Sequence, residues 1–275
     1  MKVGILTHHY VANYGAFLQG WCLRETLAEL FPAADVRVID WINRKHLFIN
    51  TCGYLRFYPK RENLAAWLEK NRLPQVFARM RKTRLRLTRR VFSVSEMNAL
   101  GLDKIVVGSD EVWNYRDKKS YAAVKFGCGV GEGTTLVSYG ASVGGIRDFR
   151  DLPKEVPQGL TRFSAFAVRD DNTDAFVRAV TGKTPERVVD PVFLHAVPEG
   201  LTPRVRKLTA KPYLLFYHCA PLPEAARTDL KAFAAERGLR LLGAGEYDTL
   251  YDERSIDLDP FEWAELFRHA EHVIT

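Results

Sequence analysis

The sequence predicts an α/β fold with mostly parallel sheets, because short apolar runs alternate with segments of helical periodicity along the chain. Small and polar residues follow several of these runs directly, as expected where parallel strands end at a binding edge. A stretch interrupted by proline and glycine, residues 197–211, separates two such alternations. We therefore expect two α/β domains, residues 1–197 and residues 198–275.

The first domain is expected to begin with a strand, a helix and a second strand, at Val3–Thr7, Ala16–Phe31 and Val36–Ile39. Residues 45–99 then form a basic, largely helical insertion, in which apolar residues recur at helical spacing. Further strands of the first domain are expected at Ile105–Val107, Leu136–Tyr139, Phe166–Val168 and Val188–Val189.

The second domain repeats the alternation, with a strand at Tyr213–Tyr217, a helix at Pro223–Arg237 and a strand at Leu239–Leu242. A helix over Pro260–Ala270 is opened by Asp259 as N-cap and by proline as first helical residue. His272–Thr275 begins another strand. Because a sheet ending there has an unpaired edge, we expect the second domain to be incomplete and the chain to be a truncated one.

The composition is that of a globular protein, with 47% hydrophobic and 27% charged residues among 275. The sequence has no apolar run of membrane-spanning length, and polar His8 and His9 come too early for a signal peptide. The histidines lack metal-site spacing, and because His8 and His9 face opposite ways in a continued strand, at most one should face a ligand. Widely separated cysteines indicate a cytoplasmic protein without a zinc site, and they are Cys22, Cys52, Cys128 and Cys219.

The net charge of +7 has a local origin. Nine Lys or Arg residues and no Asp or Glu lie between Lys70 and Ser95. We interpret this stretch as a solvated helical face beside a channel for anionic substrates. Contact of Lys70–Arg90 with an anionic membrane surface is the alternative. Aromatic residues do not interleave the basic ones, so nucleic acid is not an expected partner.

The motif after the strand at residues 104–107 is the strongest indication of a site. Gly108–Asn114 presents a hydroxyl, a carboxylate, an indole and an amide, from Ser109, Asp110, Trp113 and Asn114. A second candidate follows the first strand, where Asn13 and Gly15 open a helix. They suit either a phosphate at the helix N-terminus or an ordinary cap. The glycine pattern of dinucleotide sites is absent, so NAD is not expected.

Three further candidates follow later strands. Ser142 closes the small-residue segment 138–144. Arg169 suits a phosphate or carboxylate, or else an internal pair with Asp170 or Asp190. Asp190 belongs either to the site or to a turn. The glycine-rich segment 127–133 precedes a strand instead of a helix, so we interpret it as a surface connection.

Five motifs in this order resemble the polysaccharide pyruvyl transferase family. They are Asn13-Tyr14-Gly15-Ala16 with Leu18-Gln19, Gly108-Ser109-Asp110 with Val112-Trp113-Asn114, Ser138-Tyr139-Gly140-Ala141-Ser142, Val168-Arg169-Asp170 and Asp190-Pro191.

The resemblance implies a GT-B-like architecture of two Rossmann-like domains facing a cleft. It implies transfer of a pyruvyl group, without a cofactor, from phosphoenolpyruvate to a sugar of a cell-surface polysaccharide, forming a ketal. Arg169 would hold the anion, and Trp113 would stack on a sugar. The remaining implied substrate-binding residues are Asn13, Tyr14, Gly15, Ser109, Asp110, Asn114, Ser142 and Asp190.

Two departures from the family pattern affect the expected activity. Glu111 stands where the family often has glutamine, and the family's histidine, in a Ser-Phe-His-Gly-like motif, is not found in residues 1–275. The catalytic residue is therefore unassigned, and this chain alone is expected to be inactive. The alternatives are a non-catalytic sugar- or anion-binding protein and a nucleotide-sugar glycosyltransferase with a ribose contact at Asp40.

Overall fold

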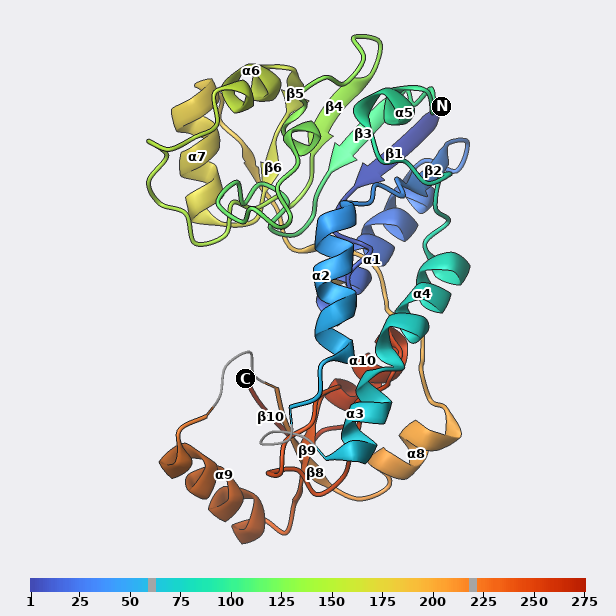
Figure 1. The fold of residues 1–275 in the computed structure, drawn as a ribbon, viewed down its shortest axis with the longest axis vertical. Coiled ribbons are helices and arrows are strands. Elements are labelled where there is room, and N and C mark those ends of the chain that lie inside the picture. The colour runs from blue at the N-terminus through green and yellow to red at the C-terminus, as the bar shows by residue number, and fades with distance from the viewer. Residues whose placement is uncertain (59–62, 218–221) are drawn as a thin grey trace. The chain divides into compact units, whose positions relative to one another are not determined.

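The computed structural model describes residues 1–58, 63–217 and 222–275, which form two compact units (Figure 1). The first unit comprises Met1–Asn50 and Met80–Ala196, and the second comprises Thr51–Arg79 and Val197–Thr275. The predicted fold class is confirmed, because each unit is an α/β structure built on a parallel sheet. The structure differs from the sequence prediction in dividing the helical insertion between the units.

The sheet of the first unit has five strands in the order β2-β1-β3-β4-β5, all parallel. They are β1 (Lys2–Leu6), β2 (Asp35–Val38), β3 (Lys104–Val107), β4 (Thr135–Ser138) and β5 (Phe163–Ala165). Leu6, Val107 and Leu136 on these strands are buried in one core. Because all strands are parallel, their carboxyl ends meet at one edge of the sheet.

A separate parallel pair, β6 (Ala167–Val168) and β7 (Glu186–Arg187), follows the main sheet. Sequence reasoning missed β5, and the strand expected at Phe166–Val168 corresponds to β6 with one residue added before it. The strand expected at Val188–Val189 is wrong by two residues. The Val188 N–H makes a further pairing bond, to the Val168 oxygen at 3.0 Å, and beyond it Val189 is 52% exposed.

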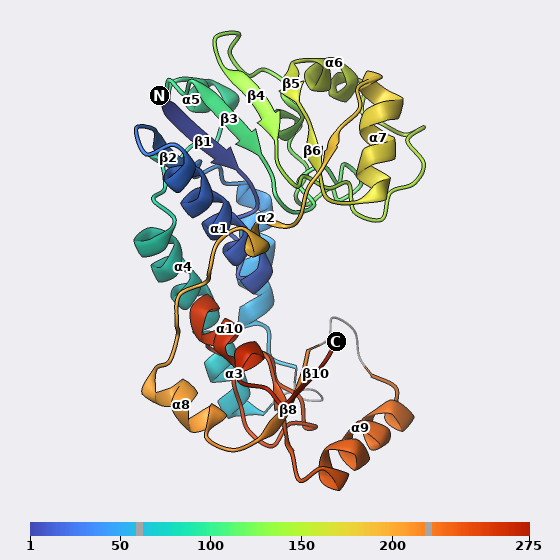
Figure 2. The same ribbon diagram turned by 180° about the vertical axis from the view of Figure 1, so that it is seen from behind.

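Helices of the first unit are positioned by local capping signals. Asn13 Oδ1 accepts a hydrogen bond from the Ala16 N–H at 2.9 Å, so the predicted cap is confirmed. Asp170 caps the helix after β6 in the same way, at 2.8 Å from the Thr173 nitrogen. The helices wholly in this unit are α1 (Tyr14–Leu30), α5 (Val94–Asn98), η1 (Ala123–Phe126), α6 (Glu155–Thr161), α7 (Asp171–Thr181) and η2 (Pro191–Phe193). α6 and α7 pack side by side (Figure 2).

The second unit has a parallel sheet in the order β10-β8-β9. Its strands are β8 (Tyr213–Phe216), β9 (Arg240–Gly243) and β10 (His272–Ile274). Its helices are α3 (Leu64–Lys70), α8 (Pro203–Thr209), α9 (Glu224–Glu236) and α10 (Pro260–Arg268), while α2 (Arg44–Leu55) and α4 (Leu73–Arg84) run from one unit to the other. The predicted start of α10 is confirmed, because Asp259 and Glu262 form a complete capping box.

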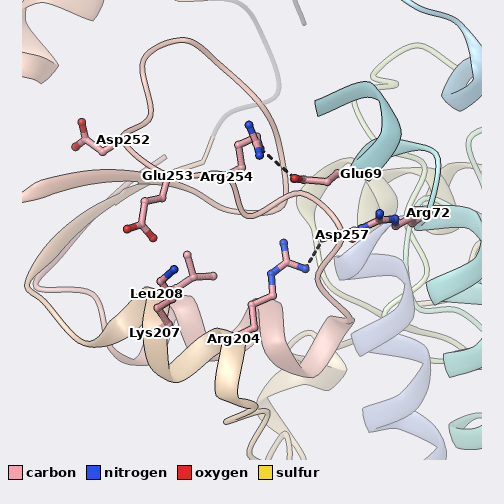
Figure 3. Close-up of a pocket in the computed structure, with 9 residues that line it drawn as sticks. All are labelled: Glu69, Arg72, Arg204, Lys207, Leu208, Asp252, Glu253, Arg254 and Asp257. Atoms are coloured by element: carbon pink, nitrogen blue, oxygen red, sulfur yellow. Dashed lines mark hydrogen bonds and ion pairs between the residues drawn. The ribbon is translucent and has the colours of Figure 1, made fainter. Parts of the chain in front are cut away.

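Ion pairs attach the inserted helices to the rest of the second unit, around a hollow of about 660 Å³ (Figure 3). Glu69 lies 3.0 Å from Arg254, and Asp257 is held by both Arg72, at 3.3 Å, and Arg204. These contacts join residues 51–79 to the rest of this unit. The hollow is lined by four basic and four acidic side chains, so its charges balance and do not favour an anion.

Candidate active site

Polar side chains gather where β1, β3, β4 and β6 end in the first unit. Isolated bridges join Asp110 to Ala141 and Ala141 to Val168, so the parallel pairing continues past the strand ends. This continuation places the residues that follow three strands at one edge. The strand-end segments predicted from the sequence around Asp110, Ser142 and Arg169 are therefore brought together.

Ser109 is the hydrogen-bonding centre of this edge and is fully buried. Its N–H donates to Gln19 Oε1 at 3.1 Å, and its backbone oxygen accepts from Thr7 Oγ1 at 2.9 Å. Its hydroxyl donates to the Gly140 oxygen at 3.0 Å and accepts from Arg169 Nη1 at 3.1 Å. Buried on all sides, Ser109 positions Arg169 and does not itself face a ligand.

Arg169 presents its guanidinium at this edge with 27% of the side chain exposed. Nη1 forms an ion pair with Asp190 Oδ2 besides its bond to Ser109. Nη2 lies 3.8 Å from Asp110 Oδ1, beyond hydrogen-bonding distance. Of the two internal partners considered from the sequence, the structure has Asp190, while Asp170 caps α7.

Asp110 adopts a backbone conformation that side chains rarely tolerate, with φ at +81°. Its Oδ1 accepts from the Glu111 N–H at 2.8 Å, and burial raises the pKa of the Asp110 carboxyl. Gly108 before it has φ at +117°, and a Cβ there would lie 2.3 Å from the Tyr139 oxygen. Only glycine fits that approach, so this backbone is shaped to hold Asp110 at the edge.

The prediction that Trp113 stacks on a sugar is wrong. Trp113 is 0% exposed, and its Nε1 donates to the Lys125 backbone oxygen at 2.7 Å. The indole packs among four core rings, those of Phe126, Phe163, Phe166 and Phe176. The chain turns inward after Glu111, which directs the largest side chain of the motif into the core.

The neighbouring polar residues shape the loops of this edge. Asn114 Nδ2 donates to Glu111 Oε2 at 3.0 Å, and Asn114 Oδ1 accepts from the Asp117 N–H at 3.2 Å. Ser142 is buried, and its hydroxyl accepts from the Gly144 N–H at 2.9 Å. The carboxylate of Glu111, expected as a charge beside the site, is thus bonded to the amide of its own motif.

The residues at the start of α1 differ in their exposure to solvent. Tyr14 is buried, while Asn13 and Gly15 are exposed. Asn13 acts as a cap, as the simpler of the two sequence interpretations expected. Binding of a phosphate or other ligand by Asn13, Tyr14 or Gly15 stays a prediction.

Sequence reasoning gave little weight to His8 and His9, which follow β1. They do face different partners, as the strand geometry predicted. His9 Nε2 lies 3.0 Å from Asp40 Oδ1, and Arg90 Nε donates to the other oxygen of Asp40 at 2.9 Å. Asp40, proposed from the sequence as a ribose contact, is 6% exposed and already occupied. His8 faces the site, with Nδ1 4.0 Å from Asp110 Oδ2.

Lys125 was missed altogether. It lies in η1, is 1% exposed, and places its amine 2.5 Å from His8 Nε2. A lone lysine among apolar residues carries no sequence signal for a site. The only hint of its burial is that both of its neighbours, Val124 and Phe126, are apolar.

Within the described ranges, no group of three His, Cys, Asp or Glu residues is arranged to hold a metal ion. Cys22, Cys52 and Cys128 are free thiols; Cys219 lies outside the described residues. Of the helices that the structure describes, none has both the length and the apolar character to cross a membrane.

Comparison with known proteins connects this edge to a family. Sequence comparison with curated proteins gives no match. Among solved structures, a putative UDP-N-acetylglucosamine 2-epimerase from Listeria monocytogenes shares 11% identity at a TM-score of 0.42, covering 100% of this chain and 69% of that one. S. aureus MnaA with UDP shares 11% identity at 0.48, over 99% and 73% of the two chains. E. coli ADP-heptose lipopolysaccharide heptosyltransferase II shares 9% at 0.42, over 99% and 78%.

A comparison with models of protein families identifies the family of this chain. A family model described as polysaccharide pyruvyl transferase matches residues 13–275. The match begins at the cap of α1 and includes the segments that supply Ser109, Asp110, Arg169 and Asp190. Because it covers essentially the whole sequence, this chain belongs to the polysaccharide pyruvyl transferase family.

Proposed function

We propose that this protein takes part in transferring a pyruvyl group from phosphoenolpyruvate to two hydroxyls of a sugar in a cell-surface polysaccharide. The observation that carries the proposal is the family match over residues 13–275. The strand-end edge of the first unit supports it, because a partly exposed guanidinium suits an anionic donor, and the pKa of the neighbouring Asp110 carboxyl is raised by burial.

The chemistry defines what the site must provide. Both sugar oxygens form bonds to the central carbon of phosphoenolpyruvate, and the bond from that carbon to the phosphate oxygen breaks. The methylene carbon gains one proton and becomes a methyl group. The two hydroxyls together release two protons, of which one balances the methyl group and the other leaves with phosphate. The site therefore needs a cationic anchor and groups that exchange protons.

The residues of the edge divide these tasks. Arg169 binds the phosphate or carboxylate of the donor through its Nη2 side, while Ser109 and Asp190 fix the guanidinium by its other nitrogen. Because burial raises the pKa of Asp110, this carboxyl takes up a proton more readily than an exposed aspartate does. Asp110 is thus suited to hold a proton at the site and to pass it on to the donor. Asn13, Tyr14 and Gly15 are proposed to contact the substrates from the start of α1.

Calorimetric titration with phosphoenolpyruvate tests the anchor. Arg169→Lys loses the fixed planar fork, so we expect binding to weaken roughly tenfold or more. Arg178→Lys is the matched control, since Arg178 is also bonded to an aspartate, Asp174, but lies on the exposed side of α7. Equal affinity of Arg169→Lys and wild type contradicts the assignment.

The same titration separates the alternatives. Binding of UDP or ADP in place of phosphoenolpyruvate supports a nucleotide-sugar glycosyltransferase, and binding of sugar or anions without turnover supports a non-catalytic protein. We further propose that the protein acts in the cytoplasm, with the basic stretch Lys70–Arg90 directed at the inner face of the membrane, where a lipid-linked acceptor is presented.

A further inference from the structure

Lys125 carries a buried amine whose close partners are neutral. Nζ donates to the Ser120 backbone oxygen at 2.9 Å and lies 2.5 Å from His8 Nε2. Among the residues that the structure describes, no carboxylate lies within ion-pair distance of it. Lysine is almost never fully buried without a charged partner. Burial of the Lys125 amine beside the candidate active site therefore lowers the stability of the fold.

The backbone of Lys125 is held by hydrogen bonds on both sides. The Lys125 backbone oxygen accepts from the indole of Trp113 at 2.7 Å, and its N–H donates to the Ala122 oxygen at 3.0 Å. The imidazole of His8 follows β1 by two residues and is 9% exposed. Both groups are therefore held by packed structure, and their contact is a property of the folded core.

The contact determines which imidazole nitrogen bears hydrogen. When the Lys125 amine donates to Nε2, that nitrogen is the acceptor, and the ring proton of neutral His8 resides on Nδ1. Nδ1 lies 4.0 Å from Asp110 Oδ2. Lys125, His8 and Asp110 thus form a line from the core to the strand-end edge.

The surrounding charges favour one proton on this pair. Burial lowers the pKa of Lys125 to about 7, against a smaller opposing effect of Asp110 and Asp117. Burial, followed by the charge of Lys125 and by His46 and His9, lowers the pKa of His8 well below its ordinary value. When the pair carries one proton, the amine therefore holds it in preference to the imidazole.

We propose that Lys125 is a positioning residue that holds His8 as its Nδ1–H tautomer and serves as an internal proton source for Asp110 through that ring. The link between amine, imidazole and carboxyl is inferred from the geometry, and its use in pyruvyl transfer rests on the proposed function. Lys125 acts through His8 and does not contact a substrate.

The transfer is balanced. An N–H bond of the Lys125 ammonium breaks as its proton passes to His8 Nε2, and the Nδ1–H bond breaks as that proton passes to an oxygen of Asp110. Lys125 is left as a neutral amine, His8 as the neutral Nε2–H tautomer and Asp110 as a carboxylic acid. His8 and Asp110 must approach by about 1 Å from their 4.0 Å separation to form the second hydrogen bond.

Nitrogen NMR of the 275-residue protein labelled in histidine tests the proposal without any substrate. We expect the Nδ1–H tautomer of His8, neutral from pH 6 to 8, in wild type. In Lys125→Met we expect the Nε2–H tautomer to grow and the midpoint of His8 protonation to rise by about one pH unit, a tenfold change in proton affinity. Lys183→Met is the matched control, because Lys183 also bonds a backbone oxygen, that of Phe163. An unchanged tautomer and midpoint in Lys125→Met overturns the proposal.

A second variant reports from the other side of the contact. In His8→Phe, the carbon NMR signal of the Lys125 side chain should titrate at lower pH than in wild type, because the ammonium loses its acceptor. An unchanged midpoint overturns the proposal, and the His9 signal shows in each Lys125 variant whether the fold is intact. Since these measurements use no phosphoenolpyruvate, a coupled Lys125–His8 pair without phosphoenolpyruvate binding contradicts only the proposed function.

Discussion

Trp113 joins two parts of the molecule that are separate in the sequence. It belongs to the Gly108–Asn114 motif, yet its indole fixes the backbone of Lys125. The residue that looked most like a sugar platform therefore supports the amine behind the site. Its effect on binding is indirect and passes through η1.

Replacing Trp113 should affect stability more than substrate binding. Trp113→Phe leaves the buried Lys125 oxygen without a donor, so we expect the free energy of unfolding to fall by about 1–3 kcal/mol in urea denaturation. Trp67→Phe is the control, because its indole also bonds a backbone oxygen, that of Leu55, but is only half-buried; its loss should stay below about 1 kcal/mol. If Trp113→Phe is as stable as wild type and binds sugar more weakly, the prediction is wrong and Trp113 contacts the substrate.

The sequence predicted the residues of the site unevenly, for a physical reason. Asp110 and Arg169 were identified because a charged residue directly after a buried strand has few structural roles. Trp113 and Asp40 were misplaced because the direction of a side chain after a turn depends on tertiary packing, which residue order does not reveal. Lys125 was missed because the contact that links its amine to the site, with His8 Nε2, joins residues 117 positions apart in the chain.

At the scale of elements, helix caps could be predicted from the sequence, but the pairing of strands could not. The caps Asn13 and Asp259 were identified because a cap bonds to residues two or three positions away. Strand β5 was missed because one residue, Phe166, separates it from β6, and only the structure shows that the two pair with different strands. Short strands defined by distant partners leave little trace in local sequence.

Helix α4 carries part of the basic stretch Lys70–Arg90 and supports a prediction about membranes. Its exposed residues include Arg79, Lys82 and Arg84, whereas Arg81 donates to the Tyr10 oxygen. We expect co-sedimentation with anionic vesicles at low salt and none with neutral vesicles. Reversing the charge of the three exposed residues to Glu should weaken binding roughly tenfold or more.

The control for α4 has the same net charge change elsewhere. Glu at the exposed positions Lys118, Lys211 and Lys231 should leave vesicle binding within about twofold of wild type. If both triple variants lose binding equally, net charge alone attracts the protein, and α4 has no special part in it.

At the scale of the whole molecule, the boundary near Val197 was visible in the sequence because proline and glycine interrupt both kinds of periodicity. The assignment of residues 51–79 was not visible. Helical spacing shows that a face is buried but not what it packs against, and the observed contacts include an ion pair between Arg254 and Glu69, which are 185 residues apart.

The activity of the whole chain has a direct test. Residues 1–275 lack the Ser-Phe-His-Gly-like motif that the family resemblance associates with proton donation. We therefore expect phosphate release from phosphoenolpyruvate, with a glycan acceptor present, to equal that of a heat-inactivated control. Release above that control means that a group within these residues protonates the donor, and Asp110→Asn then becomes the decisive variant.

The divided second unit has a consequence for biosynthesis. Residues 51–79 leave the ribosome early, but the segment they pack against begins only at Val197. At 5–20 residues per second, the interval is roughly 6–24 s. During that time Glu69 and Arg72 lack their ion-pair partners Arg254 and Asp257. The strands of the first unit, which precede and follow residues 51–79 in the chain, can already pair with one another. Residues 51–79 of the nascent chain thus remain unpacked during this interval, and we expect a chaperone to bind the chain there.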